Sequence, residues 1–521
     1  MPVTRQFRAP AEDGALLADP PLESIGDQVD RNAGILAASH IRVADVPLAE
    51  LRQAAAAEAI EAARAYLFEG GEPVPDSRLP LLVAGHQPDL FHPGVWAKNF
   101  ALNGLAARLG RTPLNLVVDN DTMKGFDVRW PNIAANPRDV HQIAVPFDRA
   151  DGDIPYEERR PHDPAAIATL IDRCRPLWAN WGFTPLLPEY WSKVCEHLDA
   201  GQTFGEAFVR GRRHFERRWG AINLELPVSR LSSGSAFAAF CSSLLSEMPR
   251  FAAAYNGAIL AYRRRNRLRS RHHPAPELAV TDSWWEAPFW VWRADAPRRA
   301  KLYVRRGEGC IDLRVDGRTL ACLPAQPDAL SAGWHRLAAD GWKLRPRALT
   351  LTLFARLCLA DGFLHGIGGG KYDEVTDDII RAFFQIEPPG YAVVSATLRL
   401  PLKRFLATTV SVHAAERRVR DLEWNPQQAP EAVGSFPDLV AEKDKLVKTP
   451  PHGKARREWF RSLQRVTQEM RPAVAVTLAA ERTRLQISRD ELAANDILGR
   501  RDYAWPLFPE ELLRSYFARF R

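Results

Sequence analysis

One stretch of the chain, VAGHQPDLFHPGVWAKN at residues 83–99, concentrates side chains that could bind or activate a substrate. Its candidate ligand-binding residues are Gly85, His86, Gln87, His92, Gly94 and Lys98. Pro93 is typical of the first position of a helix, where unpaired N–H groups can hold an anion. We therefore predict an anion-binding site in which His86 is catalytic, as a donor to the charge that develops on the substrate. The alternative is that the histidines only satisfy nearby backbone carbonyls.

A second stretch, HGIGGGKYDEVTDD at residues 365–378, is rich in glycine. Four glycines between a predicted strand and a predicted helix favour a concavity of backbone amides that can cradle a phosphate or carboxylate. We predict ligand binding by His365, Gly366, Gly368, Gly369, Gly370 and Lys371. The stretch matches neither the Walker motif nor the dinucleotide-binding motif. The alternative is that the glycines only allow a strand and a helix to pack closely.

Two pairs of carboxylates accompany these stretches. Asp373 and Asp377 lie one helical turn apart; we expect Asp373 to act as a base and Asp377 to bind a substrate ammonium group or Mg²⁺. Asp119 and Asp121 close a predicted strand, where alternation puts both on one side. Asp119 is thus a second candidate base and Asp121 a candidate ligand-binding residue. Helix capping and the helix dipole are simpler explanations for the same residues.

An aromatic segment, SWWEAPFWVW at residues 283–292, surrounds one carboxylate with rings. Most of these rings are expected in the hydrophobic core. A glutamate among rings also suits a pocket for an amine or a sugar, so we predict that Glu286 and Trp290 bind substrate.

Apolar runs alternate with helical patterns around the first two stretches. The runs LPLLVAG, PLNLVVDND, DGFLHGIGGG and GYAVVSATLRL are typical of buried strands. This alternation predicts an α/β fold with a doubly wound, Rossmann-like parallel sheet. We expect the strands that end at Gly85, Asp119 and His365 to lie parallel in one sheet. Both glycine-containing stretches would then face one cleft.

Four regions follow from these patterns. We expect an N-terminal helical segment at residues 1–78, a Rossmann-like core at 79–130 and 345–400, an inserted connecting region at 131–344, and a helical region at 401–521. The connecting region should contain helices followed by a small antiparallel sheet.

The C-terminal region has the pattern of a helical hairpin arm of coiled-coil type. Its two amphipathic helices are expected at about 401–424 and 453–488. An apolar stripe on the second helix has the 3, 4 spacing of a helix contact: Phe460, Leu463, Thr467, Met470 and Val474. We expect the helices to pack antiparallel, to protrude and to dimerise the protein, and we expect Pro472 to kink the second helix.

The composition is that of a globular protein, with 46% hydrophobic residues, 26% charged residues and a net charge of +7. This charge allows anionic substrates. The basic segment YRRRNRLRSRHH at 262–273 is better explained as a solvated helix face than as a nucleic-acid site, so we expect no nucleic-acid partner.

Cysteine usage and hydropathy bear on the compartment. The six cysteines have none of the spacings of a thiolate metal site, and scattered small buried thiols suit a reducing cytosol. No apolar run is long enough to span a membrane, and the first residues do not have the pattern of a secretion signal. We therefore expect a cytoplasmic protein without a membrane partner.

Taken in order, these segments resemble the cysteine-adding enzyme family of bacillithiol biosynthesis. The family has an early G-Q-Q-x-G-L-F-x-G-P-x-x-x-x-x-K stretch, to which GHQPDLFHPGVWAKN is similar through Gly85, Gln87, Leu90, Phe91 and, two positions earlier than the family's lysine, Lys98. An acidic strand end (VVDNDTMKGFD), an R-P-x-x-L helix before a glycine-rich loop (RPRAL and HGIGGG) and a helical hairpin follow in the same order. The resemblance covers roughly residues 80–515 and rests on order and spacing more than on identity.

The resemblance implies a nucleotidyltransferase-like Rossmann core, a coiled-coil arm that dimerises, and ligation of cysteine to glucosaminyl malate. His86 stands where the family has a glutamine, and His92 stands where it has a small residue. The sequence K-Y-D at 371–373 replaces a G-P-G-E type sequence. These departures lie on the expected ligand surface, so the chain resembles a divergent relative whose acceptor can differ.

The leading hypothesis is a ligase-type enzyme that joins cysteine or a related amino acid to a small anionic, sugar-malate-like acceptor. ATP or ADP is the candidate nucleotide and Mg²⁺ a candidate ion, and the partners would be small-molecule substrates and a second copy of the chain. A nucleotidylyl transferase on the same core and a non-catalytic binding protein are the alternatives. Convergence of the two loops and Asp119 on one cleft would favour an enzyme.

Overall fold

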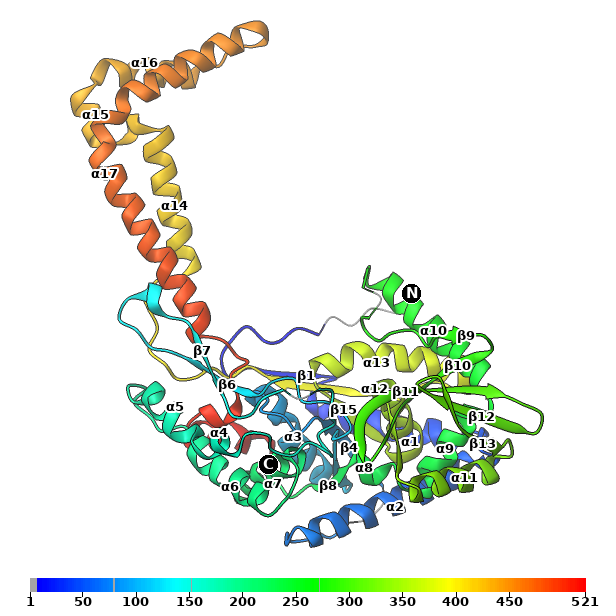
Figure 1. Ribbon diagram of the computed structural model, residues 1–521. Coiled ribbons are helices and arrows are strands. Elements are labelled where there is room, and N and C mark those ends of the chain that lie inside the picture. The colour runs from blue at the N-terminus through cyan, green and yellow to red at the C-terminus, as the bar shows by residue number, and fades with distance from the viewer. Residues whose placement is uncertain (1–6, 78–79, 151, 271) are drawn as a thin grey trace.

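The computed structural model describes residues 7–77, 80–150, 152–270 and 272–521. A six-stranded sheet lies in the body of the molecule (Figure 1). In spatial order its strands are β1 (Leu16–Asp19), β16 (Ala392–Ala396), β15 (Gly362–His365), β4 (Leu81–His86), β5 (Thr112–Val117) and β8 (Leu224–Pro227). All neighbours pair in parallel except β1, which is antiparallel to β16. The prediction of one parallel sheet for β4, β5 and β15 is therefore confirmed.

The order in which the chain adds strands to the sheet reverses between β4 and β15. From β4 it adds β5 and then β8 on one side, and it returns to add β15 and β16 on the other side. Helix α3 (Pro93–Leu109) follows β4, and α13 (Ile367–Ile379) follows β15. The buried residues of α3 and α13 belong to two different hydrophobic cores. In open α/β sheets such a reversal leaves a crevice beyond the strand ends.

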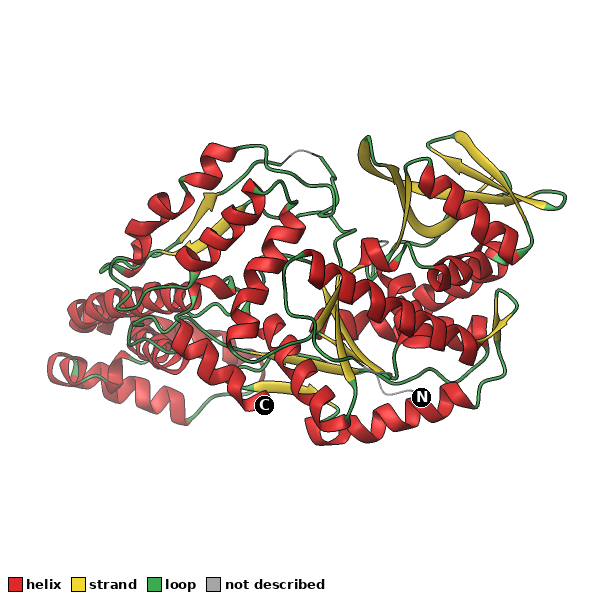
Figure 2. Ribbon diagram, turned by 90° about the horizontal axis from the view of Figure 1, so that it is seen from below, coloured by secondary structure: helices red, strands yellow, loops and turns green. Residues whose placement is uncertain are grey.

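Both faces of the sheet are buried, which explains the uninterrupted apolar runs of the sequence. Leu81 and Val83 of β4 belong to one core, while Leu82 and Ala84 belong to the other. Figure 2 shows helices on both sides of the strands. The first core includes residues of α2 (Leu48–Glu69), α8 (Val228–Leu231), α9 (Ser235–Ser246), α10 (Met248–Arg265), α11 (Pro327–Ala339), α12 (Ala348–Phe354) and α13. The second includes residues of α1 (Ile25–Ala37), α3, α5 (Leu170–Trp178), α6 (Leu187–Asp199), α7 (Phe204–Arg218) and α18 (Glu510–Phe517).

The two edge strands of the sheet come from regions where the sequence predicted other structure. Strand β8 lies within the expected insertion at 131–344, and β1 lies within the expected helical segment at 1–78. Both strands have only four residues, so their periodicity is too short to be distinguished from loop.

A second, antiparallel sheet has the order β13-β12-β11-β10-β14, with β9 paired to β10. Its strands are β9 (Val280–Thr281), β10 (Trp284–Arg293), β11 (Ala296–Arg306), β12 (Cys310–Val315), β13 (Arg318–Pro324) and β14 (Trp342–Pro346). The small antiparallel sheet expected in the connecting region is therefore present. The remaining short elements are β2 (Arg42–Val43), β3 (Val46–Pro47), β6 (Asp127–Pro131), β7 (Gln142–Pro146) and α4 (Pro164–Ala168).

The C-terminal helices form an arm that projects from the body (Figure 1). Its stem pairs α14 (Thr409–Trp424) with α17 (Arg456–Leu498) through buried Val412, Ala415, Val419, Leu478 and Leu485. Ion pairs Glu416–Arg489 and Glu423–Arg482 fix an antiparallel register, as predicted. Two further helices, α15 (Pro430–Ser435) and α16 (Pro437–Lys448), pack against the distal half of α17.

The bend expected in the long helix is present. Helix α17 contains Pro472, and Figure 1 shows α17 changing direction between its part beside α16 and its part beside α14. A proline removes a backbone hydrogen bond and clashes with the preceding turn, which is an ordinary cause of such a bend.

Candidate functional site

A cavity of about 1200 Å³ lies beyond the carboxyl ends of β4 and β15, where the chain reverses. His86 and His365, the last residues of the two strands, both line it. Other walls come from α3, the starts of α12 and α13, residues 7–9 and residues 499–502 after α17. The structure thus brings the two glycine-containing stretches to one cavity, as the sequence predicted.

The glycine-rich stretch is the start of a helix rather than a loop. Gly366 alone separates β15 from α13, and residues 368–370 belong to the first turn of α13. In the described chain no side chain caps this helix start, and residues 366–369 line the cavity. A Cβ at Gly366 or Gly368 would meet no atom within 4 Å, so the backbone there is uncovered. The unpaired N–H groups of this turn are available to an anion.

Two of the predicted binding glycines serve packing instead. A Cβ at Gly94 would clash with the carbonyl oxygen of Ala396 in β16, and a Cβ at Gly370 would clash with the Val393 side chain. Neither glycine is among the described residues that line the cavity. Their predicted ligand-binding role is wrong, because close helix–strand packing already requires the missing side chain.

His365 and Asp373 form a hydrogen-bonded pair at the edge of the cavity. His365 Nε2 lies 2.8 Å from Asp373 Oδ2, and Arg356 pairs with the same carboxylate at 2.7 Å. Although burial opposes ionisation, Arg356 and His365 hold the pKa of Asp373 below its ordinary value. Gly369 leaves room beside the second ring nitrogen, because a Cβ there would lie 2.5 Å from His365 Nδ1.

This arrangement changes the roles predicted for the two acidic residues of α13. Asp373 is buried and outside the cavity lining, so it cannot be the base that contacts substrate. Asp377 pairs with Arg356 at 2.6 Å and is also outside the lining. The residue of this group that reaches the cavity is His365, with an ionised Asp373 to orient it.

His86 was predicted to donate a hydrogen bond to the substrate, but its free ring nitrogen is an acceptor. Its Nδ1 lies 3.0 Å from the carbonyl oxygen of Gln87, which only an N–H can satisfy. Burial, with the positive charge of Lys98, lowers the pKa of His86 to about 3, so the ring is neutral. Its Nε2 is then an acceptor, which does not fit the predicted role as donor to an oxyanion.

Gln87 and His92 both line the cavity and are fixed by local hydrogen bonds. Gln87 Nε2 donates to Asp121 Oδ2 at 3.1 Å. His92 caps α3, because its Nδ1 accepts from the Gly94 N–H at 3.1 Å. Burial lowers the pKa of His92 to about 4, so His92 is also neutral at pH 7.

Lys98 supplies a buried amine to the cavity wall. Its side chain is almost fully buried, and Nζ donates to the carbonyl oxygen of Gly85 at 2.5 Å. Within the described ranges it has no carboxylate partner, and burial, together with nearby Arg212, lowers the pKa of Lys98 to about 7. A bound anion would restore the charge of this amine.

The aspartates after β5 separate instead of facing one site. Asp121 lines the main cavity and pairs with Arg299 at 3.0 Å. Asp119 lines a different cavity of about 90 Å³ and accepts the Ser229 N–H at 2.9 Å. Burial and neighbouring Glu157 raise the pKa of Asp119 to about 7. The expected convergence of Asp119 with the two loops is therefore wrong, because β5 ends at Val117 and strand alternation does not extend to the two aspartates.

The aromatic segment supports the second sheet and does not bind in the cavity. Glu286 is fully buried between Arg347 at 2.6 Å and Lys301 at 3.0 Å. The guanidinium groups of Arg299 and Arg347 lie 4.7 Å and 4.4 Å from the centre of the Trp290 ring. Neither Glu286 nor Trp290 lines the cavity, so their predicted substrate role is wrong. A buried carboxylate among rings here satisfies buried cations.

The described cavity lining is strongly cationic. Six Lys or Arg residues contribute to it, against two carboxylates, Asp121 and Asp502. The six are Arg8, Lys98, Lys124, Lys371, Arg500 and Arg501. Sequence reasoning found Lys98 and Lys371 but missed the other four. Arg500 and Arg501 follow α17, some 400 residues beyond the first stretch, and no local pattern marks them as part of this site.

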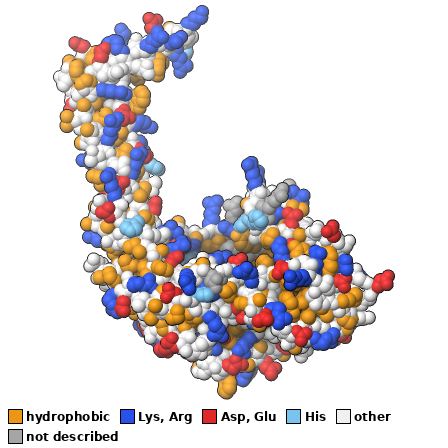
Figure 3. All heavy atoms as spheres, in the orientation of Figure 1, with side chains coloured by type: hydrophobic (Ala, Val, Ile, Leu, Met, Phe, Trp, Pro, Cys, Tyr) orange, Lys and Arg blue, Asp and Glu red, His pale blue; other side chains and the backbone are white. Residues whose placement is uncertain are grey.

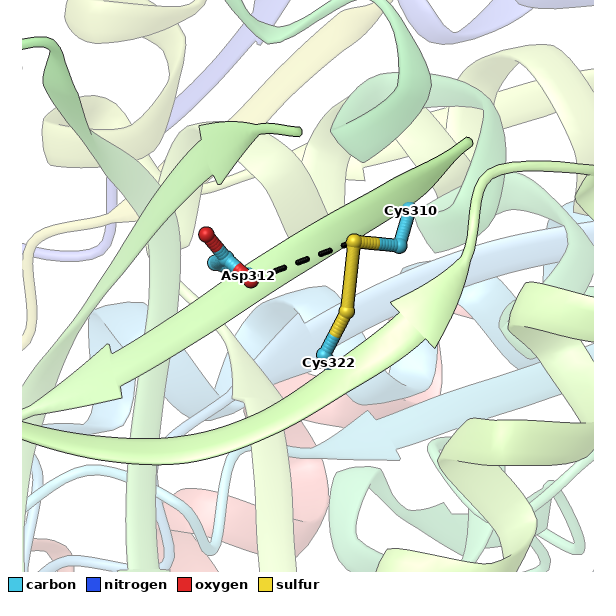
Figure 4. A group of neighbouring side chains, drawn as sticks. All are labelled: Cys310, Asp312 and Cys322. Carbon is cyan, nitrogen blue, oxygen red and sulfur yellow. Dashed lines mark hydrogen bonds between the residues drawn. A yellow bond between two sulfur atoms is a disulfide. The ribbon is translucent and has the colours of Figure 1, made fainter. Parts of the chain in front are cut away.

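A pair of cysteines differs from the expectation of separate thiols. Cys310 and Cys322 form a disulfide between β12 and β13, and Asp312 lies beside it (Figure 4). The hairpin register sets Cys310 opposite Pro324 and Cys322 opposite Asp312, so the two cysteines are diagonal neighbours on adjacent strands, which cysteine spacing alone does not show. Cys174, Cys241 and Cys358 are buried, as expected of small apolar side chains.

Two arginines of the basic segment at 262–273 make ion pairs with residues outside it. Arg263 pairs with Glu277, and Arg265 pairs with Asp378.

Every helix in the described ranges is too short or too polar to cross a bilayer. No family model matches the sequence, and no curated protein matches it.

Proposed function

We propose that this chain is a ligase-type enzyme that joins cysteine or a related amino acid to a small anionic acceptor in the cavity between β4 and β15. One observation carries the proposal: an uncapped helix start, the buried Lys98 amine and a carboxylate-oriented histidine line the same cavity. An anion site beside a proton acceptor is what acyl transfer to an amine requires.

The topology supports a Rossmann-like core for this enzyme. Numbered along the chain, the five parallel strands have the spatial order 3-2-1-4-5. Doubly wound nucleotide-binding sheets share this order and bind ligands where it reverses. The nucleotidyltransferase type and a nucleotide substrate, ATP or ADP, are part of the proposal.

His365 is the general base in the proposed reaction. Nε2–H donates to Asp373, so Nδ1 accepts the proton that the substrate ammonium group releases. Before this, a carboxylate oxygen of the acceptor attacks the γ-phosphorus of a nucleoside triphosphate, which releases the nucleoside diphosphate and leaves an acyl phosphate. The amine nitrogen then attacks the carbonyl carbon of this acyl phosphate. The C–N bond forms as the bond to the phosphate leaving group breaks, and the electron pair departs with the phosphate. The first turn of α13 and Lys371 hold that charge.

The cavity volume and charge fit two anionic substrates. About 1200 Å³ exceeds the usual size of a site for one small ligand. Asp121 and Asp502 are the carboxylates of the described lining, and both are paired with arginine. A Mg²⁺ ion that accompanies ATP would therefore be held mainly by phosphate and water.

Product analysis tests the proposal. Purified protein is mixed with ATP, Mg²⁺, cysteine and glucosaminyl malate, and the products are identified by mass spectrometry. We expect an amide whose mass is the sum of cysteine and acceptor less one water, together with hydrolysed nucleotide. A nucleotidylated acceptor formed without cysteine would instead favour a nucleotidylyl transferase. No turnover of ATP across a panel of amino acids and malate-bearing sugars would contradict the enzyme.

A further inference from the structure

The positive charge of the chain is concentrated at the far end of the arm. Residues 443–465, here called the arm tip, contain eight Lys or Arg residues and two acidic residues. They therefore supply a net charge of +6, out of +7 for the whole chain. Figure 3 shows Lys and Arg side chains gathered at the free end of the arm.

Most cations of the arm tip are exposed and have no acidic partner. Among the described residues, Arg465 pairs with Glu442 and Glu469, and Lys443 is buried against the Trp424 carbonyl oxygen. The six other cations are exposed and form no ion pair with any residue that the structure describes: Lys445, Lys448, Lys454, Arg456, Arg457 and Arg461. Unpaired cations at such density repel one another, so a polyanion would stabilise them.

The arm tip is a packed structure rather than a loose basic tail. Helix α16 contacts α17, and Trp459 Nε1 donates to the Leu446 carbonyl oxygen across the pair at 2.7 Å. Leu446, Leu463 and Trp459 are partly buried. The cations are therefore presented on a preformed surface.

An exposed aromatic ring lies among these cations. Phe460 is 50% exposed, and Arg456 and Arg457 precede it by four and three residues on α17. Residues at these spacings share a helix face, so one turn presents two guanidinium groups and the next presents a ring. An aromatic platform for a base beside cations for the flanking phosphates is typical of proteins that bind single-stranded nucleic acid.

We propose that the arm tip binds single-stranded RNA, with Phe460 stacking on a base and Arg456, Arg457 and Arg461 contacting phosphates. Accessible, unstacked bases are mainly a property of RNA loops and single strands. An acidic lipid surface fits less well, because an interfacial helix needs a continuous apolar face. Here Leu446, Leu463 and Trp459 turn toward the helix pair, which leaves only Phe460 and Val447 as large apolar side chains at least half exposed in the described arm tip.

Fluorescence anisotropy of the full-length chain with a labelled, unpaired 20-nucleotide RNA tests this inference. We expect the logarithm of the association constant to fall with the logarithm of salt concentration with a slope of about −2 to −4, for three to six phosphate contacts. Arg457→Glu combined with Arg461→Glu should weaken binding at least tenfold. Phe460→Ala should weaken it about fivefold or more, with a smaller change of slope than the double arginine variant.

The matched control is Arg417→Glu combined with Arg420→Glu, which makes the same charge change at exposed positions of α14 outside the arm tip. This variant should bind RNA within about threefold of the unaltered chain. Absence of RNA binding at low salt, equal weakening by both double variants, or tighter binding to phosphatidylserine vesicles or to DNA of the same sequence would each overturn the proposal. The outcome is independent of the proposed ligase activity, which the arm-tip variants should leave unchanged.

Discussion

His365 illustrates how a residue's role depends on contacts that its sequence neighbours do not reveal. It ends β15, and Asp373 reaches it from the second turn of α13. The bond leaves Nδ1 as the only ring nitrogen of His365 without a hydrogen-bond partner in the described chain. A carboxylate that accepts from one ring nitrogen fixes the tautomer, so the other nitrogen has a lone pair that can accept a proton.

We predict that His365→Gln lowers turnover at least 100-fold in the reaction proposed above. Glutamine retains an N–H for Asp373 but has no basic nitrogen at the position of Nδ1, so proton acceptance is lost while the buried carboxylate stays satisfied. Steady-state kinetics and a thermal melt measure the two effects. Asp119→Asn, in a separate cavity, is the control and should turn over normally. Turnover of His365→Gln within threefold of the unaltered enzyme, at pH 7, would contradict the assigned base.

Lys98 should leave a signature in the pH dependence of stability. Burial lowers its pKa from 10.5 to about 7, so between these values the unfolded chain holds this proton while the folded chain does not. Lys98 therefore increases the free energy of unfolding as pH rises from about 7 to 10.5, with a slope of at most about 1.4 kcal/mol per pH unit. Below pH 7 both states are protonated and the contribution no longer changes.

Denaturant unfolding of the unaltered chain and of Lys98→Met at several pH values isolates this effect. The difference in unfolding free energy between the two should shift in favour of the unaltered chain as pH rises above 7. Curves that stay parallel from pH 6 to pH 10 would show that the Lys98 amine is not desolvated as the structure indicates.

At the scale of elements, the start of α13 contains two kinds of glycine. Gly368 faces open space, whereas Gly370 packs against Val393. We predict that Gly368→Ala melts at or above the temperature of the unaltered chain, because alanine lowers the entropy cost of ordering the helix. Gly370→Ala should cost about 1–3 kcal/mol through overpacking. Calorimetric melts of both variants check this, and an equal loss in both would contradict the assigned packing.

The elements themselves could largely be read from the sequence. Buried strands such as β4 and β16 have apolar runs because both faces of the sheet are covered, and this signal is local. A helical hairpin was also predicted from the apolar spacing, but the stripe expected from Phe460 to Val474 is not the one that contacts α14. Leu478 and Leu485 make that contact, and Phe460 is half exposed. Strands β1 and β8 could not be predicted from the sequence, because each has only four residues and so too little periodicity.

Only part of the site could be predicted from the sequence. Glycines and histidines marked the two stretches, but residue type alone does not separate a glycine that faces a ligand from one that packs, as Gly368 and Gly370 show. Asp119 and Asp121 likewise differ in which cavity they reach. Arg500 and Arg501 join the cavity only through the tertiary path of α17 back to the body.

At the scale of the whole molecule, the arm is connected to the cavity and exposes apolar side chains on its stem. Residues 499–502, directly after α17, form part of the cavity wall. Val410 and Val476 are 75% and 84% exposed, which is unusual for large apolar side chains. Burial of Val410 and Val476 against a second copy of the chain would explain why these exposed positions are apolar.

We therefore predict a homodimer formed through the arm stem. Light scattering at micromolar concentration should give twice the mass of the chain, and Val476→Asp should shift the protein to a monomer by placing a charge in the apolar contact. Arg420→Glu, at an exposed position ten residues from Val410 and therefore on another face of α14, serves as the control surface change. A monomeric unaltered chain would rule out this assembly.

Calorimetric titration of ATP into the unaltered chain and into Gly368→Asp tests most directly whether the cavity is an anion-binding active site. Aspartate at this uncovered position adds negative charge to the first turn of α13 without a predicted clash, so the fold should be retained. We predict saturable binding to the unaltered chain and at least tenfold weaker binding to the variant at an unchanged melting temperature. Equal affinity in both proteins, or no binding to the unaltered chain, would contradict the proposed site.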